Sequence, residues 1–117
     1  MEFDSNKPIY LQIADVICNR ILQGDLKGED RIPSVREYGA QIGVNPNTVA
    51  RTYDTLTERG VIYNKRGIGF FVAENACQII RKESREIFLK DELPAFAAKA
   101  RLLGIDNNEL SRLLFKD

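Results

Sequence analysis

Apolar residues recur every three or four positions through most of the chain, and this spacing is typical of amphipathic helices. The first such stripe covers residues 8–24, and two more cover residues 35–43 and 46–60. Each stripe is narrow and is bounded by polar positions, so each helix has one face to bury. We therefore predict three helices that share one small core.

Capping residues mark where the second and third helices begin and end. Ser34 followed by Glu37 forms a capping box, and Gly43 suits a left-handed residue that ends the helix. Asn45 is a favourable N-cap, and Pro46 takes the first helical position, where its missing N–H costs nothing. Two short helices joined by such a tight turn predict a helix-turn-helix unit.

The helical spacing ends at Gly60, and two short β-prone runs follow at residues 61–64 and 70–73. Glycine-containing loops of this length commonly join hairpin strands, so we predict a hairpin with a five-residue loop. The loop is basic, and we expect it to contact backbone phosphates of DNA or the minor groove. An ordinary solvated turn is the alternative. The loop residues expected at DNA are Lys65, Arg66, Gly67 and Gly69.

From residue 74 onward the pattern is again helical, with a break or kink expected between Asp91 and Pro94. Gly104 ends this part, and Asp106 with Glu109 caps a last helix. These helices carry more apolar surface than they can bury against each other, which indicates two-fold self-association. The residues expected at that interface are Ile80, Ile87, Phe88, Leu93, Phe96, Ala100, Leu103, Leu110 and Leu114.

The face of the third helix opposite its apolar stripe carries amide, hydroxyl and guanidinium groups in its first turns. Such groups bind base edges and phosphates, and a recognition helix presents its N-terminal residues to DNA. Capping of first-turn N–H groups is the competing role for Asn45, Asn47 and Thr48. The candidates for DNA contact in the helix-turn-helix are Ser34, Arg36, Asn45, Asn47, Thr48, Arg51 and Thr55.

Composition and charge distribution also bear on which classes of function we expect. The 117 residues carry 17 basic and 17 acidic side chains, but residues 31–69 hold six basic and three acidic ones. This modest surplus predicts salt-sensitive binding that two linked copies would strengthen. Histidine is absent, and we find no metal-spaced cluster, phosphate-binding loop or nucleophile–base pair, so we expect no enzyme activity, metal or cofactor.

Other features concern location. No apolar run has the length of a membrane span, and the N-terminus lacks the pattern of a signal peptide. Cys18 and Cys77 lie in apolar helical patterns, and we expect buried thiols of a reducing compartment rather than a disulfide. We therefore expect a cytoplasmic protein that makes no contact with a membrane.

Several motifs together resemble one family over residues 8–73. They are PIYLQI at 8–13, GDL at 24–26, IPSVRE at 32–37, GV at 43–44, TV at 48–49, Leu56, ERG at 58–60 and RGIGFFV at 66–72. This pattern is similar to the winged-helix domain of the GntR family of bacterial transcriptional regulators. The NPNTV motif at 45–49 and the short helical tail resemble the YtrA subfamily, whose tail dimerises. The resemblance implies a mainly α winged helix-turn-helix domain at 1–75 and a helical dimerisation region at 76–117.

The resemblance also implies roles for single residues. Arg36 matches a DNA-contacting arginine at the start of the second helix, and Thr48 matches a threonine that begins the recognition helix. Gly67 and Gly69 match the wing glycines. Pro46 and Ala50 stand where the family often has arginine, and we expect Arg51 to compensate. A surface ion pair of Arg36 with Glu37 or Asp54 is the alternative to DNA contact.

We therefore predict a dimeric, sequence-specific repressor of double-stranded operator DNA with inverted half-sites about 34 Å apart. The alternative is a winged-helix module that binds a protein and no DNA. The residues after the hairpin are too few for a large enclosed ligand pocket. A small-molecule effector would have to bind at the dimer interface or beside the tail, and no residue identifies one.

Overall fold

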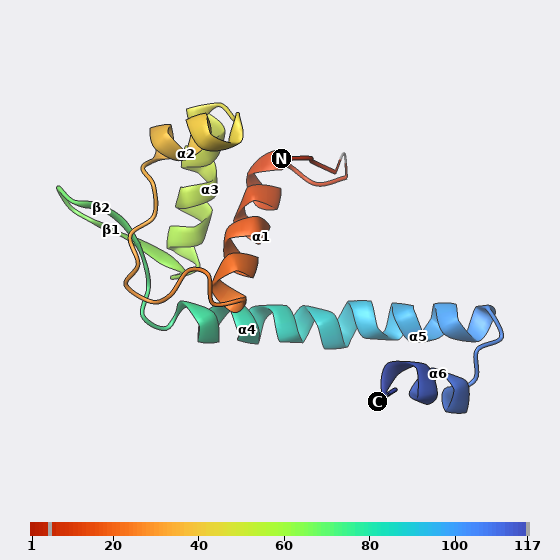
Figure 1. Cartoon of the computed structure of the whole chain (residues 1–117). Helices are drawn as coiled ribbons and strands as arrows, with labels where there is room; N and C mark the ends of the chain where they lie inside the picture. The colour runs from red at the N-terminus through yellow and green to blue at the C-terminus, as the bar shows by residue number, and fades with distance from the viewer. Residues whose placement is uncertain (5, 117) are drawn as a thin grey trace. The chain divides into compact units, whose positions relative to one another are not determined.

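The computed structural model in Figure 1 describes residues 1–4 and 6–116. Contacts divide the chain into two compact units, one of Met1–Arg81 and one that begins at Lys82. The described residues are mainly helical, with a single two-stranded antiparallel hairpin. The predicted class, mainly α with a small β-hairpin, is therefore confirmed.

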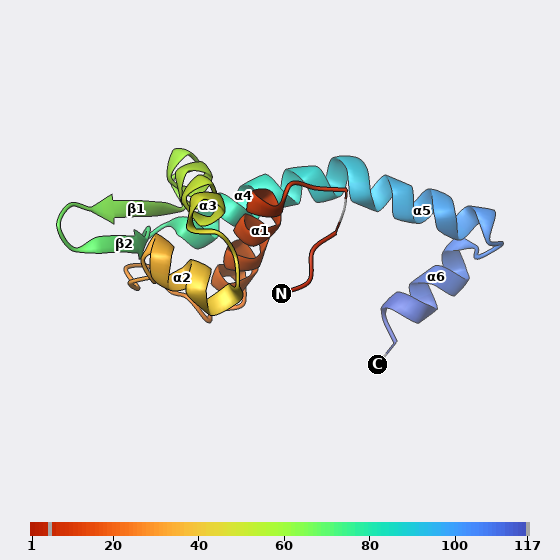
Figure 2. The same ribbon diagram turned by 90° about the horizontal axis from the view of Figure 1, so that it is seen from above.

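The first unit is built on three helices, α1 (Ile9–Leu22), α2 (Val35–Ile42) and α3 (Pro46–Glu58). α3 packs against both α1 and α2, as Figures 1 and 2 show. The apolar stripes meet in one core, as the spacing predicts. The core residues from these helices include Ile13, Ala14, Ile17, Ile21, Tyr38, Val49, Tyr53 and Leu56.

The hairpin joins β1 (Ile62–Lys65) to β2 (Gly69–Val72), with Lys65 opposite Gly69. Because these two residues pair, the loop has three residues, 66–68, and the predicted five-residue loop was too long. A segment before α2 lies along β2 and was not predicted. Ile32 donates its N–H to the Phe70 carbonyl at 3.0 Å, and Arg31 bridges Phe71.

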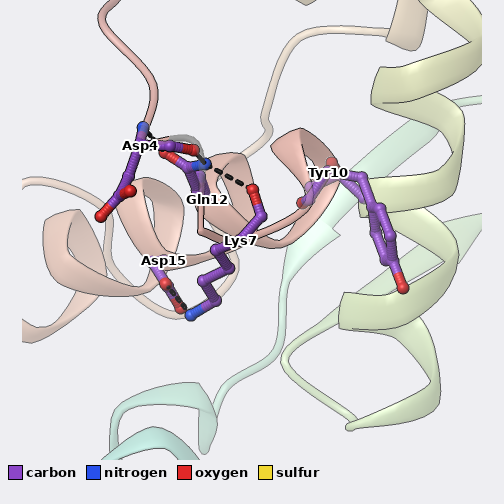
Figure 3. Close-up of polar contacts among 6 residues, drawn as sticks. Asp4, Lys7, Tyr10, Gln12 and Asp15 are labelled. Carbon is purple, nitrogen blue, oxygen red and sulfur yellow. Dashed lines mark hydrogen bonds and ion pairs between the residues drawn. The ribbon is translucent and has the colours of Figure 1, made fainter.

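The described residues of the segment before α1 are attached to the first unit, although they carry no helical or strand pattern in the sequence. Phe3 packs against the core. The Gln12 side-chain oxygen accepts from the Asp4 N–H at 2.6 Å, and its amide donates to the Lys7 carbonyl at 2.7 Å. Figure 3 shows these bonds together with the ion pair between Lys7 and Asp15. Hydrogen bonds to one glutamine side chain thus satisfy backbone groups in the described part of this segment, which has no regular secondary structure.

The next helix, α4 (Ala76–Ile87), begins as part of the first unit's core. Ile80 is 1% exposed there, so its prediction as a dimerisation residue was wrong. Helical spacing alone does not say which partner an apolar side chain packs against. Ile80 completes the winged-helix core instead of facing another chain.

The second unit continues through a π-helical segment η1 (Phe88–Glu92), then α5 (Leu93–Leu102) and α6 (Asn107–Leu114). The backbone stays helical from Ile87 to Leu93, so there is no break before Pro94. Leu93 donates its N–H to the Phe88 carbonyl, five residues earlier. A π turn therefore directly precedes Pro94, the residue that has no N–H to donate to the continuing helix.

Candidate nucleic-acid interface

Local capping places the start of α3 as predicted. The Asn45 side chain accepts a hydrogen bond from the Asn47 N–H at 2.8 Å, and Pro46 takes the first turn. Val49 and Tyr53 turn into the core, whereas Asn47 and Arg51 are exposed. The first two turns of α3 therefore present a polar edge on the surface of the first unit.

The turn between α2 and α3 is tight because two glycines permit it. Gly43 has φ 71°, the left-handed conformation predicted for the residue that ends α2. Gly39 lies where a Cβ would come within 2.7 Å of the Val44 carbonyl oxygen. Val44 in turn donates its N–H to the Gly39 carbonyl at 2.9 Å. This close approach sets the spacing between the starts of α2 and α3.

The capping box of α2 is confirmed. The Ser34 hydroxyl accepts from the Glu37 N–H at 3.1 Å, and Glu37 accepts from the Ser34 N–H at 3.1 Å. The bond from the Ser34 N–H is the main reason that the pKa of Glu37 lies below its usual value. Ser34 is thus a cap whose hydroxyl proton stays available for DNA.

Arg36 lies in the first turn of α2 and is exposed. It makes no ion pair with any residue that the structure describes, so the predicted alternative partners Glu37 and Asp54 do not hold it. A shallow surface depression joins this residue to the start of α3. The depression is lined by Val35, Arg36, Asn45, Pro46, Asn47 and Ala50.

A second depression lies on the other side of α3, where the start of α1 meets it. Its lining residues are Pro8, Ile9, Tyr10, Asn47, Thr48 and Arg51. The guanidinium carbon of Arg51 lies 4.2 Å from the centre of the Tyr10 ring, a cation–π contact. Tyr10 and Arg51 are far apart in the chain and no local motif links them, so their contact could not be predicted from the sequence.

Thr55, a predicted DNA contact, has its hydroxyl turned back to its own helix. It donates to the Arg51 carbonyl at 3.0 Å and is only half-buried. Such back-bonding is common for threonine within helices. Its hydroxyl can still accept a hydrogen bond, but it no longer offers its proton to a phosphate.

The tip of the hairpin is exposed at Lys65, the last residue of β1, and at Arg66 and Gly67 in the loop. The Lys65 ammonium lies 4.6 Å from the centre of the Phe71 ring, so its position is partly set by β2. Gly69 has φ 140°, and a Cβ there would come within 3.2 Å of the Arg31 Nε. Arg31 is exposed and adds a cation beside the hairpin that the sequence analysis did not place at the site.

The predicted interface residues of the second unit are largely exposed. Ala100 is buried and Leu110 is half-buried, and neither offers much surface. The exposed members of the prediction are Ile87, Phe88, Leu93, Phe96, Leu103 and Leu114. An apolar cleft of about 540 Å³ lies within this unit, lined by Phe88, Glu92, Leu93, Phe96, Leu114 and Phe115.

Among the described residues, no helix is long and apolar enough to cross a membrane, and no group of acidic or cysteine side chains could hold a metal. Cys18 and Cys77 are not joined in a disulfide. The first unit presents a capped turn between α2 and α3, a polar start of α3 and a basic hairpin that follows α3. These features define a winged helix-turn-helix protein, a class that binds nucleic acid.

The model of the gntR family of bacterial regulatory proteins matches residues 9–72, and the chain belongs to this family. The chain is 35% identical over 106 residues to the HTH-type transcriptional repressor YtrA of Bacillus subtilis, covering 91% of this chain and 81% of that protein. It is therefore a DNA-binding transcriptional regulator, and no enzyme activity belongs to this class. Family membership favours DNA binding over the alternative of a module that binds only protein.

Two solved structures show the same fold. A crystal structure of a GntR-family transcriptional regulator from Bacteroides thetaiotaomicron has a TM-score of 0.74 and 49% identity, covering 92% of this chain and 94% of that one. The DNA-binding domain of AraR in complex with operator ORX1 has a TM-score of 0.57 and 30% identity, covering 62% of this chain and 93% of that one. The likeness to AraR extends to a domain that was crystallised on DNA.

Proposed function

We propose that the chain is a homodimeric repressor that binds an operator with inverted half-sites. The relative YtrA is called a repressor. Exposed apolar residues of the kind seen in the second unit usually mark an interface, and two-fold association is the commonest arrangement. The apolar cleft beside Phe96 is the surface that we assign to the partner protomer.

In this proposal the first three turns of α3, residues 46–55, enter the major groove. Asn47 and Arg51 are assigned to base edges, while Asn45 and Arg36 are assigned to phosphates. The observation that carries the proposal is the exposed Asn47–Arg51 edge, which is free of ion pairs with the described residues. Thr48 is half-buried at the same helix start, and we assign it to phosphate.

The hairpin is assigned to the adjacent backbone or minor groove, with Lys65 and Arg66 as its cations. Arg31 joins them, because its guanidinium lies against Gly69 at the end of the hairpin loop. Two cations of the hairpin and one beside it suit phosphate contact, which depends on charge and little on sequence.

We also assign residues 1–75 to DNA binding and residues 76–117 to dimerisation. The first turns of α4 belong to the core of the first unit, so the dimerisation surface begins beyond Ile80. Two protomers related by a two-fold axis would place their α3 helices in successive major grooves. Half-sites should then lie about 34 Å apart or at a multiple of that distance.

Replacing Arg51 by alanine tests the major-groove assignment. If Arg51 binds a base edge, R51A should lose about 1–3 kcal/mol on the selected duplex and little on random DNA. The measurement is a titration of the wild-type chain and the variant against a duplex selected from a random pool, at two salt concentrations. Arg20→Ala, in the last turn of α1, is the charge-matched control. An equal loss on both DNAs would make Arg51 a phosphate contact.

A further inference from the structure

The start of α1 lies beside the surface that we assign to base recognition. Tyr10 is the second residue of α1, and its ring lies against the Arg51 guanidinium at 4.2 Å. Figure 3 shows the ring extending towards α3, away from the bonds that Gln12 makes. Arg51 makes no ion pair with a described residue, so this ring is the contact that orients its charge.

The backbone of Tyr10 is itself attached to α3. Thr52, next to Arg51, is fully buried, and its hydroxyl donates to the Tyr10 carbonyl at 2.7 Å. A buried hydroxyl that finds a partner across two helices holds them at one distance, because losing that bond leaves a polar group without water. The backbone at Tyr10 is therefore held at a defined distance from the residue next to Arg51.

The other side of the α1 start is held as well. Gln12 binds the backbone at Asp4 and Lys7, and the Lys7 ammonium pairs with Asp15 (Figure 3). Ile13 and Ala14, one turn after Tyr10, are buried in the core. The first turn of α1 is thus a rigid support rather than a loose end.

An arginine on a helix surface ordinarily samples many rotamers, and docking it on a base costs that freedom. An aromatic ring beneath the guanidinium removes part of this cost before DNA arrives, and it leaves the N–H groups at the edge of the plane available. We propose that Tyr10 is a positioning residue that holds Arg51 in its base-binding orientation and so contributes to operator specificity. This inference rests on the proposed function of the Asn47–Arg51 edge.

A double-mutant cycle tests the coupling. Tyr10→Leu removes the ring face and keeps apolar volume, whereas Tyr10→Phe keeps the ring and removes only the hydroxyl. Tyr10→Leu should lower the ratio of selected-duplex to random-duplex affinity about two- to five-fold, the range for an exposed cation–π contact, and Tyr10→Phe should leave it unchanged. In an Arg51→Ala background, Tyr10→Leu should have no further effect on the ratio.

This ratio separates positioning from a merely structural role. A partly unfolded variant loses affinity for both duplexes alike, so its ratio does not change. A second measurement needs no DNA: the side-chain protons of Arg51 should show a ring-current shift in NMR spectra of the wild-type chain and of Tyr10→Phe, and should lose it in Tyr10→Leu.

Three other outcomes would overturn the inference. If Tyr10→Leu costs as much with alanine at 51 as with arginine, Tyr10 acts on DNA directly and the inference is wrong. Loss in Tyr10→Phe on both duplexes would indicate a hydroxyl–phosphate contact and would also overturn it. If the wild-type chain binds no selected duplex at low salt, the proposed function fails and the inference fails with it.

Discussion

Gly39 shows how a single residue determines the geometry of the helix-turn-helix. It lies inside α2, where glycine is usually unfavourable, and it is buried against the turn that leads to α3. A Cβ at this position would lie 2.7 Å from the backbone oxygen of Val44 and 3.6 Å from the Cα of Pro46. Backbone atoms cannot move aside as a flexible side chain can, so the absence of a side chain is what permits the turn.

Gly39→Ala should therefore destabilise the first unit, although alanine is the better helix former. The propensity gain is up to about 1 kcal/mol, whereas forcing extra atoms into a packed site costs about 1–3 kcal/mol. We expect a net loss of about 1–2 kcal/mol in chemical denaturation, with weaker DNA binding. Gln41→Ala, an exposed change in the same helix, should stay within about 0.5 kcal/mol. A Gly39→Ala variant as stable as wild type would show that the turn can widen freely.

Tyr38, next to Gly39, is buried in the core of the first unit. Its ring packs near that of Tyr53, with centroids 6.3 Å apart, and burial raises the pKa of both hydroxyls. The Tyr53 hydroxyl donates to the Pro33 carbonyl at 2.7 Å, so this buried polar atom has a partner. The aromatic pair thus fills the core on the α2 side of α3.

At the scale of the element, the hairpin is stabilised by backbone hydrogen bonds to a segment that lies far from it in the chain. The segment before α2 donates and accepts backbone bonds along β2, for example from the Val72 N–H to the Asp30 carbonyl at 2.8 Å. An isolated two-stranded hairpin is marginal in water, and a third paired segment stabilises it. This paired segment contains Arg31, so its pairing places the Arg31 guanidinium beside the hairpin.

Lys65→Ala should weaken binding to every duplex alike. If Lys65 contacts one phosphate, the slope of log affinity against log salt should fall by about one. The measurement is a salt series on selected and random duplexes. Lys99→Ala removes the same charge from α5 and should leave the slope unchanged. An unaltered slope in Lys65→Ala would place the hairpin loop outside the DNA interface.

The π-helical segment is a feature of an element that sequence spacing alone does not specify. Asp91 and Pro94 predicted a break or kink; the helix does not break, and a π-helical turn lies at Phe88–Glu92. Around this segment Ile87, Phe88 and Leu89 are all exposed, each close to half of its surface or more. Of these three residues, Phe88 lines the apolar cleft that we assign to the partner.

At the scale of the whole molecule, dimerisation through the second unit is the proposal with the largest consequence for affinity. Phe96→Glu places a charge in the apolar cleft of that unit and should shift a dimer to monomer in sedimentation experiments. Because two linked half-sites bind far more tightly than one, operator affinity should fall by at least about 100-fold. Binding to random DNA at low salt should change less.

Ala98→Glu is the matched control, since it adds the same charge to another exposed position of α5. It should leave both the dimer and operator affinity intact. A Phe96→Glu variant that stays dimeric would move the interface elsewhere. A wild-type chain that is monomeric at all concentrations would remove dimerisation from the proposed function.

The amino-acid sequence by itself determined the features whose causes lie within a few residues. Capping at Ser34 and Asn45, the left-handed Gly43 and the change of period after Gly60 are local, so the helices of the first unit and the hairpin were predictable. The exposed edge with Asn47 and Arg51 followed from the same helical spacing.

Only the tertiary structure decided which distant residues meet. The contact of Tyr10 with Arg51, the support of the hairpin by Arg31 and the burial of Ile80 in the first core each join segments that no local pattern connects. An amphipathic stripe states that a face must be buried, but the partner that buries it depends on how the whole chain packs. For the same reason the sequence predicted the exposed edge that we assign to DNA, whereas the contact that positions its arginine came from the fold.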